Sequence, residues 1–445
     1  MTAATADRKT RWANRRAASV NRTTELGLIV IVALIVVAAY TLASLGKSAS
    51  LPVNLGPFLA IILGLFVLGN VALRQFAPRA DPVLLPIAGL LNGVGYVVIV
   101  RLNHKLAGLQ AIWTLLGMAA FIGTIVVIRR VRDLERYRYL LGFGGVGLLL
   151  LPFVPGIGRT INGSRVWVHL GPLNFQPGEI AKVALLCFGA SYLAEKGVVL
   201  AQGDRHFGPI PLPDLRALGP VALAWALSIV IMVAGHELGM GLLYFTLFIT
   251  MLVVATGRRR YLAAGTALFA LAALFAYKTS KVLHERVTVW IDPWKTAQSS
   301  GYQIVQSVFA FGAGGISGTG LALGSPTRIP EVQTDFIFAA IGEELGFVGT
   351  VTILLGYLLI VGVGLRIAVR AEQPFDKLVA VGASAIFALQ TFIIVGGVTR
   401  LLPLTGITLP FVYYGGSSLL TNYVLLALLL RISDSSARTA VGLPA

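Results

Sequence analysis

Long apolar runs recur along the whole chain, and short polar stretches separate them. A helix needs about 20 mainly apolar residues to cross a bilayer, and about twelve runs approach that length. Gly and Pro inside some runs are compatible with spanning helices, because neighbouring helices can satisfy the freed backbone groups. The pattern predicts an all-α polytopic integral membrane protein. The expected spans are 26–45, 55–73, 82–100, 109–128, 139–155, 177–195, 216–234, 238–256, 261–277, 335–365, 378–398 and 410–430.

Composition supports the bilayer as the solvent. Of the 445 residues, 56% are hydrophobic and only 12% are charged, whereas a soluble domain has about 25% charged residues. The net charge of +17 is typical of Lys and Arg gathered in cytoplasmic loops, and no nucleic-acid-binding module accompanies it. The single cysteine, Cys187, excludes an intrachain disulfide, and the five histidines lack metal-ligand spacing.

The basic residues also predict the topology. The first apolar run, at about 20 residues, is longer than the 7–15 residues usual in a signal peptide, so we expect an uncleaved helix. With a cytoplasmic N-terminus, roughly two thirds of the Lys and Arg face the cytoplasm. We expect a basic cytosolic tail over 1–24, one membrane domain over 25–432 with a large outer loop at 278–334, and a short cytosolic tail over 433–445. A smaller outer loop covers 156–176.

Charged residues inside or beside spans need a reason, because they are costly there. Glu179 and Lys182 are three residues apart and share a helix face. They either neutralise each other or form a charged floor beneath an outward-facing cavity, and both interpretations stay open. Glu237 is expected to be a helix-start acid or to line a cavity.

Three further acids lie near the tenth run. Asp335 is most simply a helix-capping group. Glu343 and Glu344 are adjacent inside a span, so at least one is expected to have a basic partner or to face water.

The large outer loop contains the strongest candidate for chemistry. Asp292 is flanked by Trp290 and Trp294, with Arg286 and Lys295 near in sequence. A carboxylate beside apolar rings acts as a base when burial raises its pKa, although an aspartate in a turn is also ordinary.

Two glycine-rich segments are better explained by structure than by ligand chemistry. Residues 312–320 lack a preceding strand and the Gly-Lys-Ser of a phosphate loop, so they predict a tight turn. Residues 406–418, at the start of the last helix, favour close helix packing or a broken helix around a ligand.

Five stretches together resemble the FtsW/RodA/SpoVE family of cell-wall polymerases. They are 165–179, 237–239, 286–293, 330–346 and 409–418, and the resemblance covers roughly 85–432. The family usually has Ser at 178, Asp at 237, His at 333 and Ser at 413, where this chain differs. It also has three spans before the Gln-Pro stretch, whereas five are expected here, which resembles a RodA-like subgroup with a role in cell elongation.

The resemblance implies a peptidoglycan glycosyltransferase that polymerises lipid II on the outer face of the cytoplasmic membrane. The family's catalytic aspartate corresponds to Asp292, which would act as the general base. Cations near the leaving pyrophosphate would stabilise its charge. The candidate substrate-binding residues are Arg286, Lys295, Glu179, Lys182, Glu237, Arg165, Trp167, Glu343 and Ser417.

The resemblance also implies a partner, a class B penicillin-binding protein that acts as a transpeptidase. A divalent cation, Mg²⁺ or Mn²⁺, is an expected cofactor that the sequence does not identify. Two alternatives remain open on the residues alone. Twelve spans with buried charges also suit a lipid-precursor flippase or transporter, and a non-catalytic scaffold for a transpeptidase is the other.

Overall fold

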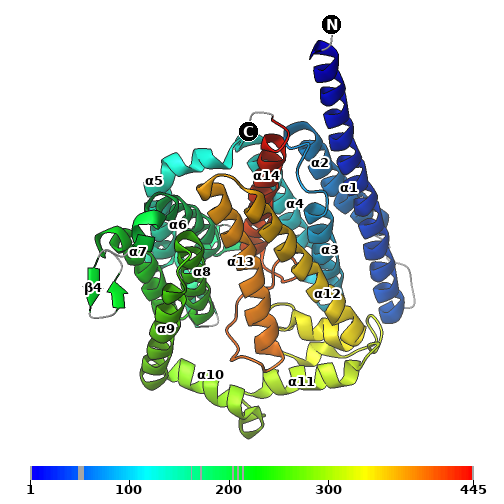
Figure 1. Cartoon of the computed structure of the whole chain (residues 1–445). Helices are drawn as coiled ribbons and strands as arrows, with labels where there is room; N and C mark the ends of the chain where they lie inside the picture. The colour runs from blue at the N-terminus through cyan, green and yellow to red at the C-terminus, as the bar shows by residue number, and fades with distance from the viewer. Residues whose placement is uncertain are drawn as a thin grey trace.

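The computed structural model describes residues 3–48, 55–161, 163–170, 173–202, 205–207, 210–212 and 215–442. Within them the chain forms a bundle of long helices, and both termini lie at one end of it (Figure 1). Two short helices, α10 and α11, cross the opposite end. The helices are α1 (Ala3–Ser48), α2 (Leu55–Phe76), α3 (Leu84–Leu102), α4 (His104–Val127), α5 (Arg138–Leu150), α6 (Pro177–Gln202), α7 (Leu215–Ala234), α8 (Leu238–Thr256), α9 (Arg259–Thr279), α10 (Lys281–Ile291), α11 (Tyr302–Gly314), α12 (Ile337–Arg370), α13 (Pro374–Val398) and α14 (Gly416–Thr439).

The prediction of a multi-pass helical membrane protein is confirmed. Within the described ranges, nine helices are long and apolar enough to cross a membrane. Shorter apolar segments lie at Ile61–Phe76 in α2 and Leu218–Ala234 in α7, and α5 has only 13 residues. Each of the twelve expected runs therefore overlaps a helix, while the number of crossings stays a prediction.

Several expected boundaries were wrong. α5 ends at Leu150 instead of reaching residue 155, because Pro152 lies in the short 3₁₀ segment η2 (Leu151–Phe153) that follows. The last helix begins at Gly416, not near 410. At the other end of the chain, α1 begins at Ala3 and its candidate span begins at Arg22, so the cytosolic tail expected over 1–24 stays a prediction.

Short strands interrupt the all-α pattern in two loops. β1 (Gly158–Ile161), β2 (Ser164–Leu170) and β3 (Leu173–Phe175) form an antiparallel sheet, in which Arg159 pairs with Trp167. Gly163 adopts a φ of 81° in the turn between the first two strands, a backbone conformation that favours glycine. β4 (Arg205–Phe207) and β5 (Ile210–Leu212) form a separate hairpin.

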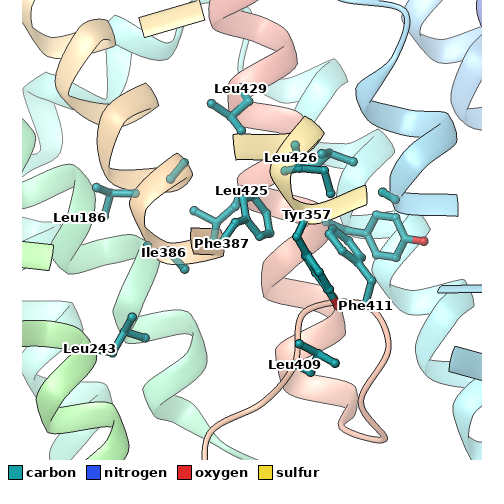
Figure 2. Packing of buried hydrophobic residues seen from close by; sticks show 14 of the residues in the cluster. Leu186, Leu243, Tyr357, Ile386, Phe387, Leu409, Phe411, Leu425, Leu426 and Leu429 are labelled. Atoms are coloured by element: carbon teal, nitrogen blue, oxygen red, sulfur yellow. The ribbon is translucent and has the colours of Figure 1, made fainter. Parts of the chain in front are cut away.

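The connection between α13 and α14 enters the core instead of remaining on the surface. Phe411 has only 2% of its surface exposed, and its ring stacks on Phe387 at 5.7 Å and meets the edge of Tyr423 at 5.2 Å. Figure 2 shows Phe411 and Leu409 among side chains of α12, α13 and α14. The Tyr357 hydroxyl donates to the Pro410 carbonyl at 2.5 Å. The apolar residues near 410 therefore fill the protein core without being helical.

α12 is kinked at Gly346, which has φ 66° and ψ −164° inside the helix. A Cβ at this position would lie 2.3 Å from the Gly318 nitrogen, so glycine is required. The glycine-rich turn expected at 312–320 packs against this kink, where Phe347 N–H donates to Gly315 C=O at 2.9 Å. The turn interpretation is confirmed, because Gly315, Gly318 and Gly320 all have positive φ.

The adjacent glutamates of α12 have partners, as expected. Glu344 forms an ion pair of 3.0 Å with Arg101 at the end of α3. Glu343 accepts a hydrogen bond from the Ser325 backbone N–H at 2.6 Å. Glu343 therefore fastens the segment after α11 to α12, and Glu344 joins α12 to α3.

Candidate functional site

Two adjoining cavities lie at the end of the bundle that carries α10. The larger has a volume of about 340 Å³ and the smaller about 240 Å³, and both are lined by Arg286, Asp335 and Gly406. The larger cavity reaches the β1–β3 sheet, the α7–α8 turn and the start of α14. The smaller is enclosed by α10, the start of α11 and the α13–α14 connection. Because the same three residues line both cavities, we treat the two cavities together as the candidate functional site.

Arg286 interacts electrostatically with two half-buried carboxyl groups, those of Glu237 and Asp335. Its guanidinium donates to the Thr405 carbonyl at 3.2 Å, which ties α10 to the α13–α14 connection. Burial, and after it the charge of Asp335, raises the pKa of Glu237 to about 7, although the charge of Arg286 opposes the rise. Burial also raises the pKa of Asp335 to about 6, and Arg286 again opposes it.

The capping role expected for Asp335 was wrong. The residue flanking the start of α12 is Phe336, and it makes no side-chain capping bond. Asp335 instead lines both cavities, since the chain turns there before the helix begins. Glu237 is the residue before α8 and makes no side-chain capping bond, although an acid is favoured there by the helix dipole. It also lines the larger cavity, so the structure fits both expected roles.

Aromatic side chains line the larger cavity. Trp167 of β2 was expected there, whereas Trp113 of α4 and Tyr414 were missed. A Cβ on Gly416 would lie 1.8 Å from the Trp113 ring, so only glycine leaves room for that ring. The Gly415-Gly416 pair is therefore the feature of the sequence that could have indicated a large side chain packed against the start of α14. Flat aromatic faces beside polar groups suit the binding of ring-shaped polar ligands such as sugars.

Asp292 lines neither cavity, but it is two residues beyond Trp290, which lines the smaller one. It follows the last residue of α10, and its carboxylate accepts the Trp294 N–H at 3.2 Å at the start of the short 3₁₀ segment η3 (Pro293–Thr296). Lys295 Nζ lies 3.5 Å from the other carboxylate oxygen. The Asp292 side chain is 37% exposed, so the burial expected to activate it is incomplete. Val289 and Trp290, one turn earlier, line the cavity.

Glu179 and Lys182 form a buried ion pair of 2.7 Å at the start of α6, with exposures of 1% and 0%. Gln390 of α13 accepts from Lys182 Nζ at 3.4 Å, and the Thr408 hydroxyl contacts Glu179 at 3.4 Å. The pair is therefore self-neutralised, and its side chains line neither of the two cavities. The self-neutralising interpretation therefore fits the structure, and a charged floor beneath the cavity stays a prediction.

Three other expected substrate contacts are also outside the cavity linings. Arg165 donates to the carbonyls of Pro152 and Phe153 at 3.3 Å. Ser417 is buried and accepts the Gln176 N–H at 3.3 Å. Glu343 is occupied with the Ser325 backbone. These side chains fasten loops and helix ends near the site.

The described residues hold no group of three or more His, Cys, Asp and Glu arranged to hold a metal ion. Three carboxyl groups, those of Glu237, Glu331 and Asp335, line the larger cavity. Mg²⁺ is commonly bound by one or two carboxylates together with substrate phosphates. The donor set is thus compatible with a cation that arrives with a phosphorylated substrate.

The family model of FtsW/RodA/SpoVE, described as cell cycle protein, matches residues 84–438. The chain is 41% identical over 428 residues to the peptidoglycan glycosyltransferase RodA of Mycobacterium tuberculosis (strain H37Rv), a match that covers 94% of this chain and 91% of that protein. It is 34% identical over 368 residues to the probable peptidoglycan glycosyltransferase FtsW of Geobacter sp. (strain M18), covering 79% of this chain and 96% of that protein.

Solved structures show the same fold. A chain from a peptidoglycan synthase complex, studied for structural coordination of polymerization and crosslinking, matches with a TM-score of 0.59 and 28% identity, over 84% of this chain and 96% of that chain. The crystal structure of the rod shape determining protein RodA of Thermus thermophilus matches with a TM-score of 0.58 and 26% identity, over 80% of this chain and 97% of that chain.

Proposed function

Because the chain belongs to the FtsW/RodA/SpoVE family and is a peptidoglycan glycosyltransferase, we propose that it polymerises lipid II with Asp292 as the general base. The observation that carries this proposal is the position of Asp292. It directly follows α10, the helix whose side chains line the smaller cavity and place Arg286 at the junction of both cavities. A partly exposed carboxylate next to such a helix end can accept a proton from the hydroxyl of a substrate bound beside it.

In the proposed reaction, the 4-hydroxyl oxygen of the acceptor sugar attacks the anomeric carbon of the donor sugar. Asp292 takes the hydroxyl proton while the new C–O bond forms. The bond between the anomeric carbon and the pyrophosphate breaks, and its electron pair leaves with undecaprenyl pyrophosphate. Attack opposite the leaving group inverts the anomeric centre. The aromatic wall of Trp113 and Trp167 is a suitable surface for the sugar rings.

The leaving group gains negative charge, which nearby cations stabilise. Arg286 lines both cavities, and Lys295 is exposed beside Asp292, so these two residues are the proposed partners of the pyrophosphate. Lys182 is a poor candidate, because its charge is buried and paired with Glu179.

A divalent cation, Mg²⁺ or Mn²⁺, is part of the proposal as an accessory to substrate binding. Glu237 and Asp335 are the carboxylates that would hold it, with pyrophosphate oxygens as its other ligands. Bound there, it would neutralise charge on the pyrophosphate.

The likeness to a chain of a synthase complex that couples polymerization and crosslinking supports a transpeptidase partner, and we propose a class B penicillin-binding protein. The match to RodA over 94% of the chain supports a role in elongation and cell shape, with division as the alternative. We propose that the protein lies in the cytoplasmic membrane with both termini inside and α10 outside, because the basic loops between spans lie at the end that carries the termini.

Replacing Arg286 with alanine tests the proposed cation at the junction of the cavities. We expect kcat/KM for glycan formation from labelled lipid II, measured with the purified protein and its transpeptidase, to fall about 10²-fold, since one charge-stabilising donor is typically worth that much or more. Arg328→Ala, an exposed arginine of the same outer loop, is the control and is expected to retain wild-type kinetics. Equal kinetics of both variants would contradict the assignment.

Binding of the pyrophosphate lipid is expected to weaken as pH rises. With pKa values of about 7 for Glu237 and about 6 for Asp335, both carboxyls are mostly protonated at about pH 5 and ionised at about pH 8. The added negative charges oppose an anionic ligand, so we expect roughly a three- to tenfold loss of affinity in EDTA. Glu237→Gln is expected to reduce that loss. Affinity that is constant or rises with pH in the wild type would contradict this account.

A further inference from the structure

We propose that Arg400 is a positioning residue that holds the end of α10 against the smaller cavity and thereby fixes the place of Asp292, the residue that follows. The inference rests on the proposed role of Asp292 as general base. Arg400 lies in the connection between α13 and α14, 108 positions beyond Asp292 in the sequence, and its side chain lines the same cavity as Trp290.

Three hydrogen bonds join Arg400 to the last turn of α10. Its guanidinium donates to the Trp290 carbonyl at 3.0 Å and to the Ile291 carbonyl at 2.5 Å. The indole N–H of Trp290 donates in return to the Arg400 carbonyl at 3.2 Å. The two segments therefore hold each other reciprocally, through the residues that immediately precede Asp292.

The carbonyls that Arg400 binds are those that a helix leaves unsatisfied. The last four C=O groups of a helix have no partner within it, and this end carries partial negative charge that favours a cation. Arg400 supplies both the donors and the charge. Because the guanidinium is planar and presents several N–H groups in a fixed arrangement, it fixes the direction of the peptide that leads into Asp292.

The backbone of Arg400 is itself in an uncommon conformation, with a φ of 63°. Such a conformation costs free energy in a non-glycine residue and persists where surrounding contacts determine it. The Trp290 indole, which binds the Arg400 carbonyl, is one such contact. Arg286 adds a second connection between α10 and the same segment through the Thr405 carbonyl.

Placement matters for Asp292 because its side chain is partly exposed and makes local contacts, to the Trp294 N–H and to Lys295. These contacts orient the carboxylate relative to its own turn, whereas Arg400 fixes that turn relative to the cavity. A misplacement of about 1 Å in a reacting group can cost about 10²-fold in rate. A positioning role therefore predicts a loss of kcat with little change in KM.

The test compares wild type, Arg400→Ala, Arg400→Lys and Trp290→Phe in glycan formation from labelled lipid II by the purified protein with its transpeptidase. We expect Arg400→Ala to lower kcat about 10- to 100-fold with less than about a threefold change in KM. Arg400→Lys, which retains a donor, is expected to recover part of kcat, and millimolar guanidinium ion is expected to recover part of it in Arg400→Ala. Trp290→Phe, which loses the return bond but keeps an aromatic ring at the cavity and both bonds from the Arg400 guanidinium, is expected to lower kcat by less. Arg328→Ala is the matched control.

Wild-type kcat in Arg400→Ala would overturn the inference, and so would a loss confined to KM, which would make Arg400 a direct ligand of the substrate. If Arg400→Ala does not fold, wild-type kcat in both Arg400→Lys and Trp290→Phe would overturn it. Asp292→Asn is measured alongside. An inactive Asp292→Asn with a fully active Arg400→Ala rejects only this inference, whereas an active Asp292→Asn rejects the proposed base.

Discussion

Asp292→Asn is expected to lower kcat for glycan formation by about 10²- to 10⁴-fold, the usual contribution of a general base. Asparagine has nearly the same volume and keeps a carbonyl oxygen that can accept the Trp294 N–H, which Asp292 accepts at 3.2 Å. It cannot take the proton of an attacking hydroxyl. The ion pair with Lys295 is also lost, but Lys295 is 77% exposed, and such pairs contribute little to stability. The loss is therefore expected in rate and not in folding.

The measurement is the initial rate of glycan formation at saturating lipid II, with the melting temperature of each protein as the check on folding. Asp133→Asn is the matched control, because it makes the same chemical change at an exposed acid in the short segment before α5. We expect it to be fully active. A folded Asp292→Asn that polymerises at the wild-type rate would remove Asp292 from the chemistry and direct attention to Glu237 and Asp335.

Lys182→Met is expected to destabilise the protein by about 3–5 kcal/mol, the usual result when one partner of a buried ion pair is removed. Glu179 would remain in the core with 1% of its side chain exposed, and the Thr408 hydroxyl at 3.4 Å is a weak substitute for an ammonium. We expect a large fall in melting temperature in detergent, because desolvation of an unpaired carboxylate is costly.

The double variant Glu179→Gln with Lys182→Met separates charge from packing. It leaves no buried charge, so its melting temperature is expected to recover most of the loss. Lys196→Met, near the other end of α6 in an exposed pair with Glu195, is expected to leave the melting temperature unchanged. A single Lys182→Met variant as stable as the wild type would show that the pair does not stabilise the helix start.

The fold was largely predictable because hydropathy reports which segments avoid water. Hydropathy could not, however, distinguish a segment buried in lipid from one buried inside the protein. Phe411 was assigned to a span, yet it fills the core together with Leu409 as part of a non-helical connection. The kink of α12 at Gly346 was not predicted, since a single glycine inside an apolar run is compatible with a straight helix.

The site was predictable where the chemistry is local in sequence. Glu179 and Lys182 were found as a pair because they are three residues apart on one helix face. The Glu344 partner, Arg101, lies 243 positions away and was not identified beforehand. Arg400 was missed for the same reason, because nothing in its neighbourhood indicates that it will meet the end of α10. Contacts between distant segments depend on packing that no local pattern contains.

The central claim is that the chain joins lipid II units instead of moving or merely anchoring them. The most direct measurement adds labelled lipid II to the purified protein and its cognate transpeptidase in vesicles, and follows both product length and movement across the bilayer. The account predicts a ladder of glycan strands from the wild type. Lipid II that crosses the bilayer without lengthening, or remains unchanged, would contradict it and favour a flippase or a scaffold.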